Sequence, residues 1–311
     1  GTIPHQLFMV FQMMFAILPP ALITGAFAER FKFKSYLIFL AVWLTVVYCP
    51  VAHWVWGVDG WIRNLGGLDF AGGLVVHIAS GTSALITILV IGKRKGYQKE
   101  IMPPHSLPLT LIGTALLWFG WFGFNAGSAL SAGALASSAF VVTQVGAGAA
   151  VLGWMFIEWI QKGKPTMLGA LSGGVAGLVA ITPASGFVSP MSAIIIGLAG
   201  GVVCYMAVNM KEKFGYDDSL DVVGVHGVGG FVGAMLTGVF ASVLVNPAGA
   251  DGSLHLLKTQ FLSSVSVIIY ASLVTFIILK IIDKLFGLRV EDVEEQQGLD
   301  LTQHGESGYR F

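Results

Sequence analysis

The feature that most limits how this chain can fold is a series of long apolar runs separated by short polar segments. A helix that crosses the hydrocarbon core of a bilayer needs about 20 mostly apolar residues. Nine runs meet this requirement, at residues 4–27, 35–56, 71–92, 106–127, 134–161, 165–182, 188–210, 222–245 and 256–287. Because only 11% of the 311 residues are charged, compared with about 25% in soluble domains, we predict an all-α, polytopic bundle of membrane helices.

The last run, 256–287, is longer than one crossing requires. Its 32 residues would form a helix of about 48 Å, whereas the hydrocarbon core is about 30 Å thick. We therefore expect this helix to tilt strongly or to project from the membrane.

The loops that alternate along the predicted helices differ greatly in their basic residues. One set of loops, together with the C-terminal tail, contains 15 of the 17 Lys and Arg residues, and the other set contains only Arg63 and Lys258. Because cytoplasmic loops collect Lys and Arg, we predict a plasma-membrane protein whose N-terminus is outside and whose tail is cytoplasmic. The equal numbers of basic and acidic residues give no reason to expect a nucleic-acid partner.

Two histidines lie inside predicted spans, where polar groups are costly. His77, in LDFAGGLVVHIASG, and His226, in LDVVGVHGVGG, are 149 residues apart, and each follows a Leu-Asp pair in the third of three consecutive spans. The matching positions predict two repeats of opposite orientation, which would bring both imidazoles to a similar depth.

The residues alone leave several roles open for these polar groups. A single buried histidine is usually a hydrogen-bonded core residue, whereas a matched pair favours a function. Paired imidazoles could ligate a haem iron or join a catalytic metal site, but no HExxH motif or third clustered ligand supports a metal or cofactor. Asp69 could attract a cation or cap the helix that begins near Phe70. Cys49 and Cys204 lie in apolar runs and are predicted to be buried free thiols.

Aromatic residues gather at the predicted outer ends of the helices. The segments WVWG at 54–57 and WFGFNAGS at 121–128 each end a span there. An interfacial belt explains most such residues, although a tryptophan face beside a hydroxyl could also hold a small cation. Phe11 and Phe15 share one helix face, and the residues alone favour core packing for both.

Six segments together resemble the ammonium transporter family, Amt/Mep/Rh, on its bacterial Amt side. They are GAFAER, HWVWG, LDFAGGLVVHI, WFGFNAGS, DDSLDVVGVHGVGG and GLRVEDVEEQQGLDLTQHGESGY, in this order along the chain. The resemblance implies an eleven-span inverted-repeat fold and a homotrimer with one pore per subunit. Residues 1–287 match the third to eleventh spans, so the first two spans of the family are absent, and residues 288–311 match its cytoplasmic regulatory tail.

Carried onto this sequence, the resemblance implies a role for each of eight residues. Ammonium would be recruited by Trp56, Phe11 and Ser128 near the acid Asp69, would meet a gate of Phe15 and Phe124, and would pass a pore lined by His77 and His226. An unpaired charge in an apolar channel is very costly, whereas ammonia needs only the hydrogen-bond donor and acceptor that neutral imidazoles offer. The expected protein is therefore a transporter, not an enzyme, that deprotonates ammonium, conducts ammonia and transfers the proton separately.

The polar tail has two interpretations. By composition the tail would be disordered, whereas the resemblance implies an ordered surface that packs on neighbouring subunits and binds a PII-type regulator.

Three other functions are rivals to transport. A sensor of the same fold is the main rival, but it would need a fused output domain, and the chain ends in a family-like tail. A Rhesus-type gas channel is disfavoured because Trp56 and Ser128 resemble the ion-recruiting branch. An intramembrane hydrolase would need a nucleophile paired with a base, and the sequence shows no such pair.

Overall fold

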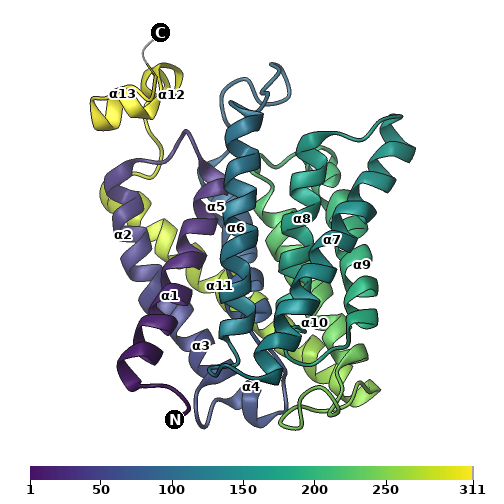
Figure 1. Ribbon diagram of the computed structural model, residues 1–311. Helices are drawn as coiled ribbons and strands as arrows, with labels where there is room; N and C mark the ends of the chain where they lie inside the picture. The colour runs from purple at the N-terminus through teal and green to yellow at the C-terminus, as the bar shows by residue number, and fades with distance from the viewer. Residues whose placement is uncertain (310–311) are drawn as a thin grey trace.

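The structure is a computed structural model that describes residues 1–309, and over that range it consists of helices, loops and one isolated β-bridge (Figure 1). Eight helices are long and apolar enough to cross a membrane. They stand side by side with the two chain ends at opposite ends of the bundle (Figure 1). The protein is thus a multi-pass membrane helical bundle, which confirms the predicted fold class.

The first group of helices lies on one side of the bundle (Figure 1). The second predicted span contains a π-helical segment, and a further π-helical segment precedes α5; such segments arise where one extra residue enters a helical turn. The elements are α1 (His5–Phe27), α2 (Phe33–Trp43), η1 (Leu44–Tyr48), α3 (Cys49–Trp56), the short α4 (Trp61–Asn64), η2 (Gly73–Ile78) and α5 (Ala79–Ile91).

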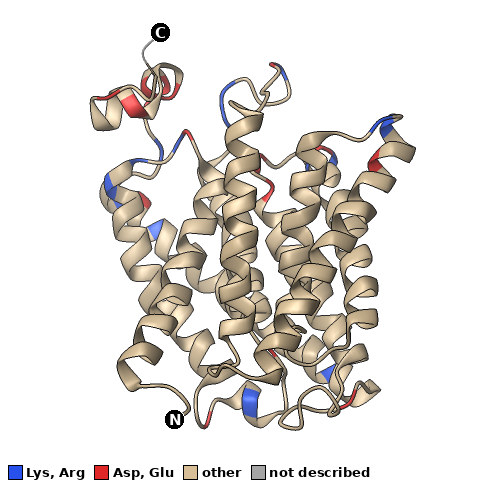
Figure 2. Ribbon diagram, in the orientation of Figure 1, with Lys and Arg blue, Asp and Glu red and all other residues tan. Residues whose placement is uncertain are grey.

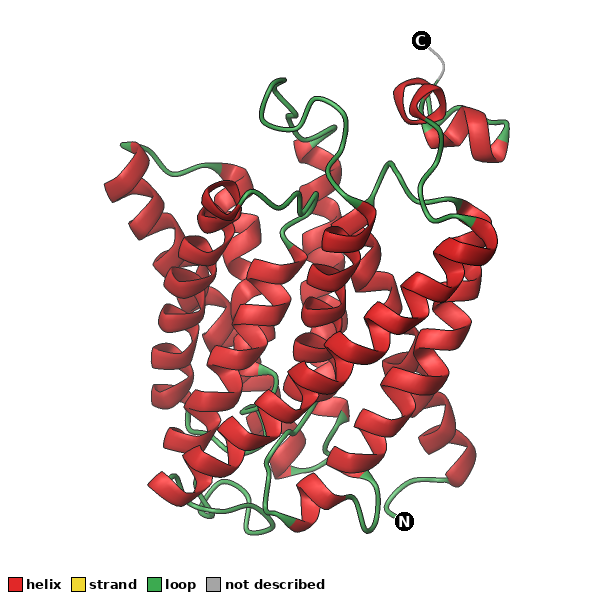
Figure 3. Cartoon of the chain, turned by 180° about the vertical axis from the view of Figure 1, so that it is seen from behind, coloured by secondary structure: helices red, strands yellow, loops and turns green. Residues whose placement is uncertain are grey.

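The second group contains a third π-helical segment and a last helix that crosses behind both groups. Its elements are α6 (Leu107–Gly127), α7 (Ala134–Lys162), α8 (Met167–Ile181), α9 (Pro190–Phe214), η3 (Val223–Val228), α10 (Gly229–Phe240) and α11 (Leu254–Phe286). The view from behind shows α11 running diagonally across the bundle (Figure 3). Its 33 residues make it longer than one crossing requires, as the sequence indicated, and its diagonal course (Figure 3) agrees with the expected tilt.

Local sequence explains where several helices begin and end. The hydroxyls of Ser106, Thr166 and Ser253 each accept a hydrogen bond from the backbone N–H three residues later, so each caps a helix start. Glycine in the left-handed conformation ends α7 at Gly163 and α9 at Gly215. The polar breaks between the predicted spans therefore coincide with real helix boundaries.

One predicted span is shorter than expected. The run 165–182 forms α8, which has 15 residues, and a buried turn follows it. The helix ends at Ile181; Thr182 still has helical backbone angles, but Pro183 has no N–H with which to continue the helical hydrogen bonds. The prediction of a full-length helix was wrong here, although its position was right.

The two cysteines differ in their surroundings. Both are free thiols, and Cys204 is buried as predicted, whereas Cys49 is exposed. Cys49 is the first residue of α3, directly after η1, and an apolar run in a membrane helix has exposed as well as buried positions. The prediction that both would be buried was wrong for Cys49.

The charged residues lie at the two ends of the bundle, and Lys and Arg are most numerous at the end that carries the C-terminal tail (Figure 2). The tail forms two short helices, α12 (Asp292–Gln297) and α13 (Leu299–His304). The backbone N–H of Val290 donates to the carbonyl of Arg30 at 3.1 Å, and Lys95 pairs with Asp292 at 2.9 Å. The disorder suggested by composition alone is therefore wrong for residues 292–304, because specific contacts with the bundle hold this segment.

Candidate functional site

The two histidine-bearing helices cross at closely spaced backbones. A methyl group on Gly81 would lie 2.2 Å from the backbone nitrogen of Gly227, and one on Gly230 would lie 2.9 Å from the Cβ of His77. No real Cβ tolerates such distances, so glycine at Gly81 and Gly230 is what permits the crossing. The crossing brings His77, on η2, next to His226, on η3.

The two imidazoles form a direct pair in the centre of the bundle. Their Nδ1 atoms lie 3.2 Å apart, and the ring centroids are 5.2 Å apart with the planes tilted by 28°. His77 is fully buried, and only 8% of His226 is exposed. The prediction that matching positions would bring the rings together agrees with this geometry.

The short Nδ1 to Nδ1 distance fixes opposite tautomers for the neutral rings. One Nδ1 must carry the hydrogen and donate it to the other. The donor ring then has an Nε2 that can only accept, and the acceptor ring has an Nε2–H that donates. The Nε2 of His77 has no hydrogen-bond partner among the residues that the structure describes, so it is free to bond a small polar molecule.

A series of aromatic contacts leads away from the histidine pair. The ring of His77 stacks on Trp121, with centroids 5.5 Å apart, and on Phe124, at 6.1 Å. Phe124 in turn contacts Phe15, with centroids 4.5 Å apart. The predicted gate residues Phe15 and Phe124 are thus in ring contact directly beside the histidine pair.

The predicted recruitment residues continue this series toward the end of the bundle that carries the N-terminus. Phe15 contacts Phe11 at 4.8 Å and the edge of Trp56 at 5.7 Å between centroids. The indole Nε1 of Trp56 donates to the backbone carbonyl of Asp69 at 2.8 Å, which fixes the orientation of the ring. The structure therefore gathers both phenylalanines and Trp56 in one cluster.

Ser128 ends α6 beside the same cluster. The ring of Phe11 lies 3.0 Å from the position that a methyl group on Gly127 would occupy. The Ser128 hydroxyl donates to the carbonyl of Phe124 at 2.8 Å, so its oxygen remains available to accept a hydrogen bond from a ligand.

Asp69 caps the helix that carries His77. Its two carboxylate oxygens accept hydrogen bonds at 2.6–3.3 Å from four backbone N–H groups, those of Gly72, Gly73, Leu74 and Val75. Of the two roles that the sequence left open, capping is the one that these contacts describe. The carboxylate also gives this end of η2 a negative charge that is only 7% exposed.

Trp121 is a site residue that the sequence analysis did not single out. Besides stacking on His77, its Nε1 donates to the hydroxyl of Thr182 at 2.9 Å, and that hydroxyl lies 3.3 Å from the amide oxygen of Asn125. The signal was present, because Trp121 precedes Phe124 by three residues and so shares its helix face.

The geometry also bears on the metal alternatives. An iron held between two axial imidazoles would separate their nitrogens by about 4 Å, twice a metal–nitrogen bond, which is longer than the 3.2 Å observed. Among residues 1–309, no group of three or more His, Cys, Asp or Glu side chains is placed to hold a metal ion.

Comparison with known proteins identifies the family. The model of the Ammonium Transporter Family matches residues 1–309. The chain belongs to the ammonium transporter family. Curated relatives in this family are named ammonium transporters, which are not enzymes, so the prediction that the chain is not an enzyme is confirmed.

Three relatives of this family member show how far the similarity extends. The protein named Ammonium transporter from Bacillus subtilis is 53% identical over 314 residues, which cover 99% of this chain and 77% of the relative. The crystal structure of Saccharomyces cerevisiae Mep2 is 40% identical with a TM-score of 0.86, covering 93% of this chain and 70% of that chain. A structure named Sensor Amt Protein is 30% identical with a TM-score of 0.88, covering 95% and 76%.

Proposed function

We propose that this protein moves ammonium across the plasma membrane by deprotonating it and conducting ammonia past His77 and His226. The observation that carries the proposal is the buried imidazole pair, whose Nδ1 atoms are 3.2 Å apart and which leaves the Nε2 of His77 without a partner. The 53% identity to a protein named Ammonium transporter supports the same substrate.

In the first step, the ammonium cation rests against the outer cluster of Phe11, Trp56 and Ser128. The face of a tryptophan ring attracts a cation by about 0.5–2 kcal/mol, depending on how far the ion is desolvated. The free lone pairs of Ser128 accept one N–H of the ion. Potassium carries the same charge but has no hydrogen to donate, so this site favours ammonium, and the buried charge of Asp69 strengthens the attraction.

In the second step, the ion loses its proton and the neutral molecule passes the gate. The contact between Phe15 and Phe124 closes the passage to a hydrated ion, and a bare charge in an apolar channel is too costly. Ammonia that passes the rings donates to the accepting Nε2 of the pair or accepts from the donating one. The proton released outside travels separately, along the histidine pair or nearby water, and recombines with ammonia in the cytoplasm.

The orientation, assembly and regulation of the protein follow the same proposal. The gathering of Lys and Arg at the end of the bundle that carries the tail supports a cytoplasmic C-terminus and an external N-terminus (Figure 2). A homotrimer and a PII-type regulator bound at the tail remain predictions from the family resemblance.

A sensor of the same fold is the second candidate, because the similar structure named Sensor Amt Protein shares the fold at 30% identity. The higher identity to a named transporter favours conduction. A sensor would bind ammonium without carrying charge or nitrogen across the membrane.

The decisive test is an ammonium pulse applied to proteoliposomes that contain the full chain, with a potassium pulse as the control. We expect a transient inward current and ammonia accumulation with ammonium only. The variant His226→Leu should retain the fold and lose or alter the flux. Silence in both current and flux would overturn transport in favour of a sensor, whereas flux without current would overturn only the separate proton transfer.

A further inference from the structure

The inner end of η3 carries a buried carboxyl group that the proposed mechanism does not use. Asp218 precedes η3 by five residues and is only 1% exposed. One of its oxygens accepts a hydrogen bond from the backbone N–H of Val223 at 2.8 Å. Its other oxygen, Oδ1, has no hydrogen-bond partner within residues 1–309.

The charged groups around Asp218 do not compensate for this unpaired oxygen. Lys211 of α9 donates to the backbone carbonyl of Asp218 and pairs with the carboxylate of Asp221. Arg94 pairs with the carboxylate of Asp217 at 2.8 Å. The titratable or charged groups around Asp218 thus come from three parts of the chain. They are Lys211 from α9; Asp217, Tyr216 and Asp221 from its own loop; and Tyr97 and Arg94 from the loop after α5.

The result is a carboxyl group that favours its protonated form. Burial raises the pKa of Asp218 to about 7, although the hydrogen bond from Val223 and the charge of Lys211 act in the opposite direction. Burial would also raise the pKa of the adjacent Asp217, but hydrogen bonds from Arg94 lower it below its usual value. Of the two neighbouring acids, only Asp218 changes charge near the pH of a cytoplasm.

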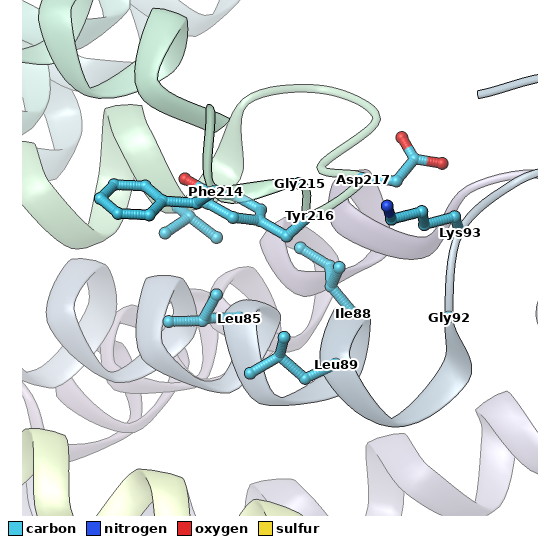
Figure 4. A pocket seen from close by; sticks show the side chains of 10 residues that line it. Leu85, Ile88, Leu89, Gly92, Lys93, Phe214, Gly215, Tyr216 and Asp217 are labelled. Atoms are coloured by element: carbon cyan, nitrogen blue, oxygen red, sulfur yellow. The ribbon is translucent and has the colours of Figure 1, made fainter. Parts of the chain in front are cut away.

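A cavity brings solvent close to this group. A pocket of about 490 Å³ lies at the same end of the bundle and is lined by Tyr216, Asp217 and Val223, which flank Asp218 along the chain. Figure 4 shows Tyr216 and Asp217 above the leucines of α5, with the ammonium group of Lys93 beside Asp217. The cavity thus reaches the residue directly before Asp218 in the chain and the residue whose N–H it accepts.

Asp218 is also linked to the histidine pair through the helix backbone. Val223, whose N–H it accepts, is the first residue of η3, and His226 is the fourth. The N–H of Val225 bonds to the carbonyl of Asp221, so the loop that holds Asp218 also fixes the first turn. A π-helical turn is an uncommon arrangement that persists only where its surroundings hold it.

From this geometry we propose that Asp218 is a positioning residue for His226, and that the cytoplasm controls conduction by setting its charge. Ionised Asp218 accepts the hydrogen bond from the N–H of Val223 and interacts favourably with the positive end of the helix dipole. These two interactions fix His226 against His77. When Asp218 gains a proton, burial of the carboxyl group becomes more favourable, but its hydrogen bond from Val223 weakens. The start of η3 then shifts while Asp218 stays buried, His226 moves from its position against His77, and conduction falls. This inference rests on the proposed transport function.

The test measures ammonium current in proteoliposomes at constant external pH while the internal pH is set between about 6 and about 8. The variant Asp218→Asn has nearly the same shape and no titratable charge. Dividing the wild-type current by the Asp218→Asn current under the same gradients removes the effect of the driving force. We expect the ratio of wild-type to Asp218→Asn current to rise about tenfold over this range, with a midpoint near 7. The exposed carboxylate of Glu212 provides the matched control, since Glu212→Gln should keep the wild-type profile.

A second variant keeps the inference testable if Asp218→Asn fails to fold. Lys211→Met removes the nearby positive charge. The internal pH at which the current of this variant is half-maximal should therefore be higher than for the wild type under the same gradients. A pH-independent current ratio, or an unmoved midpoint in Lys211→Met, would overturn the role of Asp218 and leave transport intact. Absence of any ammonium current in the wild type would overturn the transport function and, with it, this inference.

Discussion

The starts of the two π-helical segments, η2 and η3, differ in how their aspartates are bound. Asp69 accepts four hydrogen bonds from backbone N–H groups at the start of η2, and both of its oxygens are used. Asp218 bonds to the first residue of η3 through one oxygen, and its other oxygen has no partner among the described residues. The two histidine-bearing segments therefore share a backbone plan, but only Asp69 has hydrogen-bond partners for both of its carboxylate oxygens among the described residues.

The largest expected effect breaks the outer cap. In Asp69→Asn, one amide oxygen replaces two carboxylate oxygens, so buried N–H groups at the start of η2 lose their partners. We expect the free energy of unfolding to fall by about 4 kcal/mol, measured by thermal unfolding in detergent at pH 8. The matched variant Asp218→Asn should lose little or nothing at this pH, and equal losses in the two variants would contradict the difference between the caps.

The next effect tests the crossing that joins the two segments. Gly81→Ala places a methyl group 2.2 Å from the backbone nitrogen of Gly227 and should destabilise the protein by about 3 kcal/mol. Gly227→Ala meets Gly81 only at 3.4 Å, an ordinary contact, and should be tolerated. Unfolding and ammonium flux measured on both variants would show whether a methyl group is excluded at Gly81 but accepted at Gly227, as these distances indicate.

A third prediction concerns the pH dependence of stability. The folded state raises the pKa of Asp218 from 3.8 to about 7, so the folded protein binds this proton more tightly than the unfolded chain does. The stability from this group is fully present below about pH 4 and is lost as pH rises through about 7. Between about pH 5 and about pH 7, the wild type should lose about 2 kcal/mol relative to Asp218→Asn, measured by paired unfolding curves. If the free energies of unfolding of the two proteins differ by the same amount at every pH, Asp218 is ionised throughout this range.

The smallest effect is expected at an exposed carboxylate, which serves as the reference for the two buried ones. Asp292, 72% exposed, pairs with Lys95 of the bundle at 2.9 Å. Exposed pairs contribute about 0–1 kcal/mol, so Asp292→Asn should change the unfolding free energy by less than about 1 kcal/mol, and less still at high salt. A larger loss would show that the tail contributes more to stability than its exposed contacts suggest.

Much of this structure could be predicted because its dominant signal is local. A run of apolar residues without charges specifies a membrane helix wherever it occurs, and matched histidines in two such runs indicate a repeat. The prediction for α8 was too long because the run continues through Thr182, although Pro183 contained the signal for the helix end.

Other features could not be predicted because they depend on distant contacts. The tail is held by a hydrogen bond from its backbone to the carbonyl of Arg30 and by one from the backbone N–H of Lys95 to the side chain of Glu295, which composition does not reveal. The difference between Asp69 and Asp218 depends on how many N–H groups each one meets, although each precedes its histidine by eight residues. The stacking of Trp121 on His77 required knowing that two spans lie face to face.

The single hydrogen between the Nδ1 atoms of His77 and His226 has a consequence for traffic along the pair. A proton that enters at one Nε2 and leaves from the other reverses which ring owns the bridging hydrogen. A second proton cannot follow in the same direction until the bridging hydrogen and the hydrogens on the two Nε2 atoms have all returned to their starting positions, because moving the bridging hydrogen alone would leave one ring with two hydrogens and the other with none. The starting tautomers of the pair must therefore be restored between two proton transfers, and the rate of this restoration limits how fast charge can accompany ammonia.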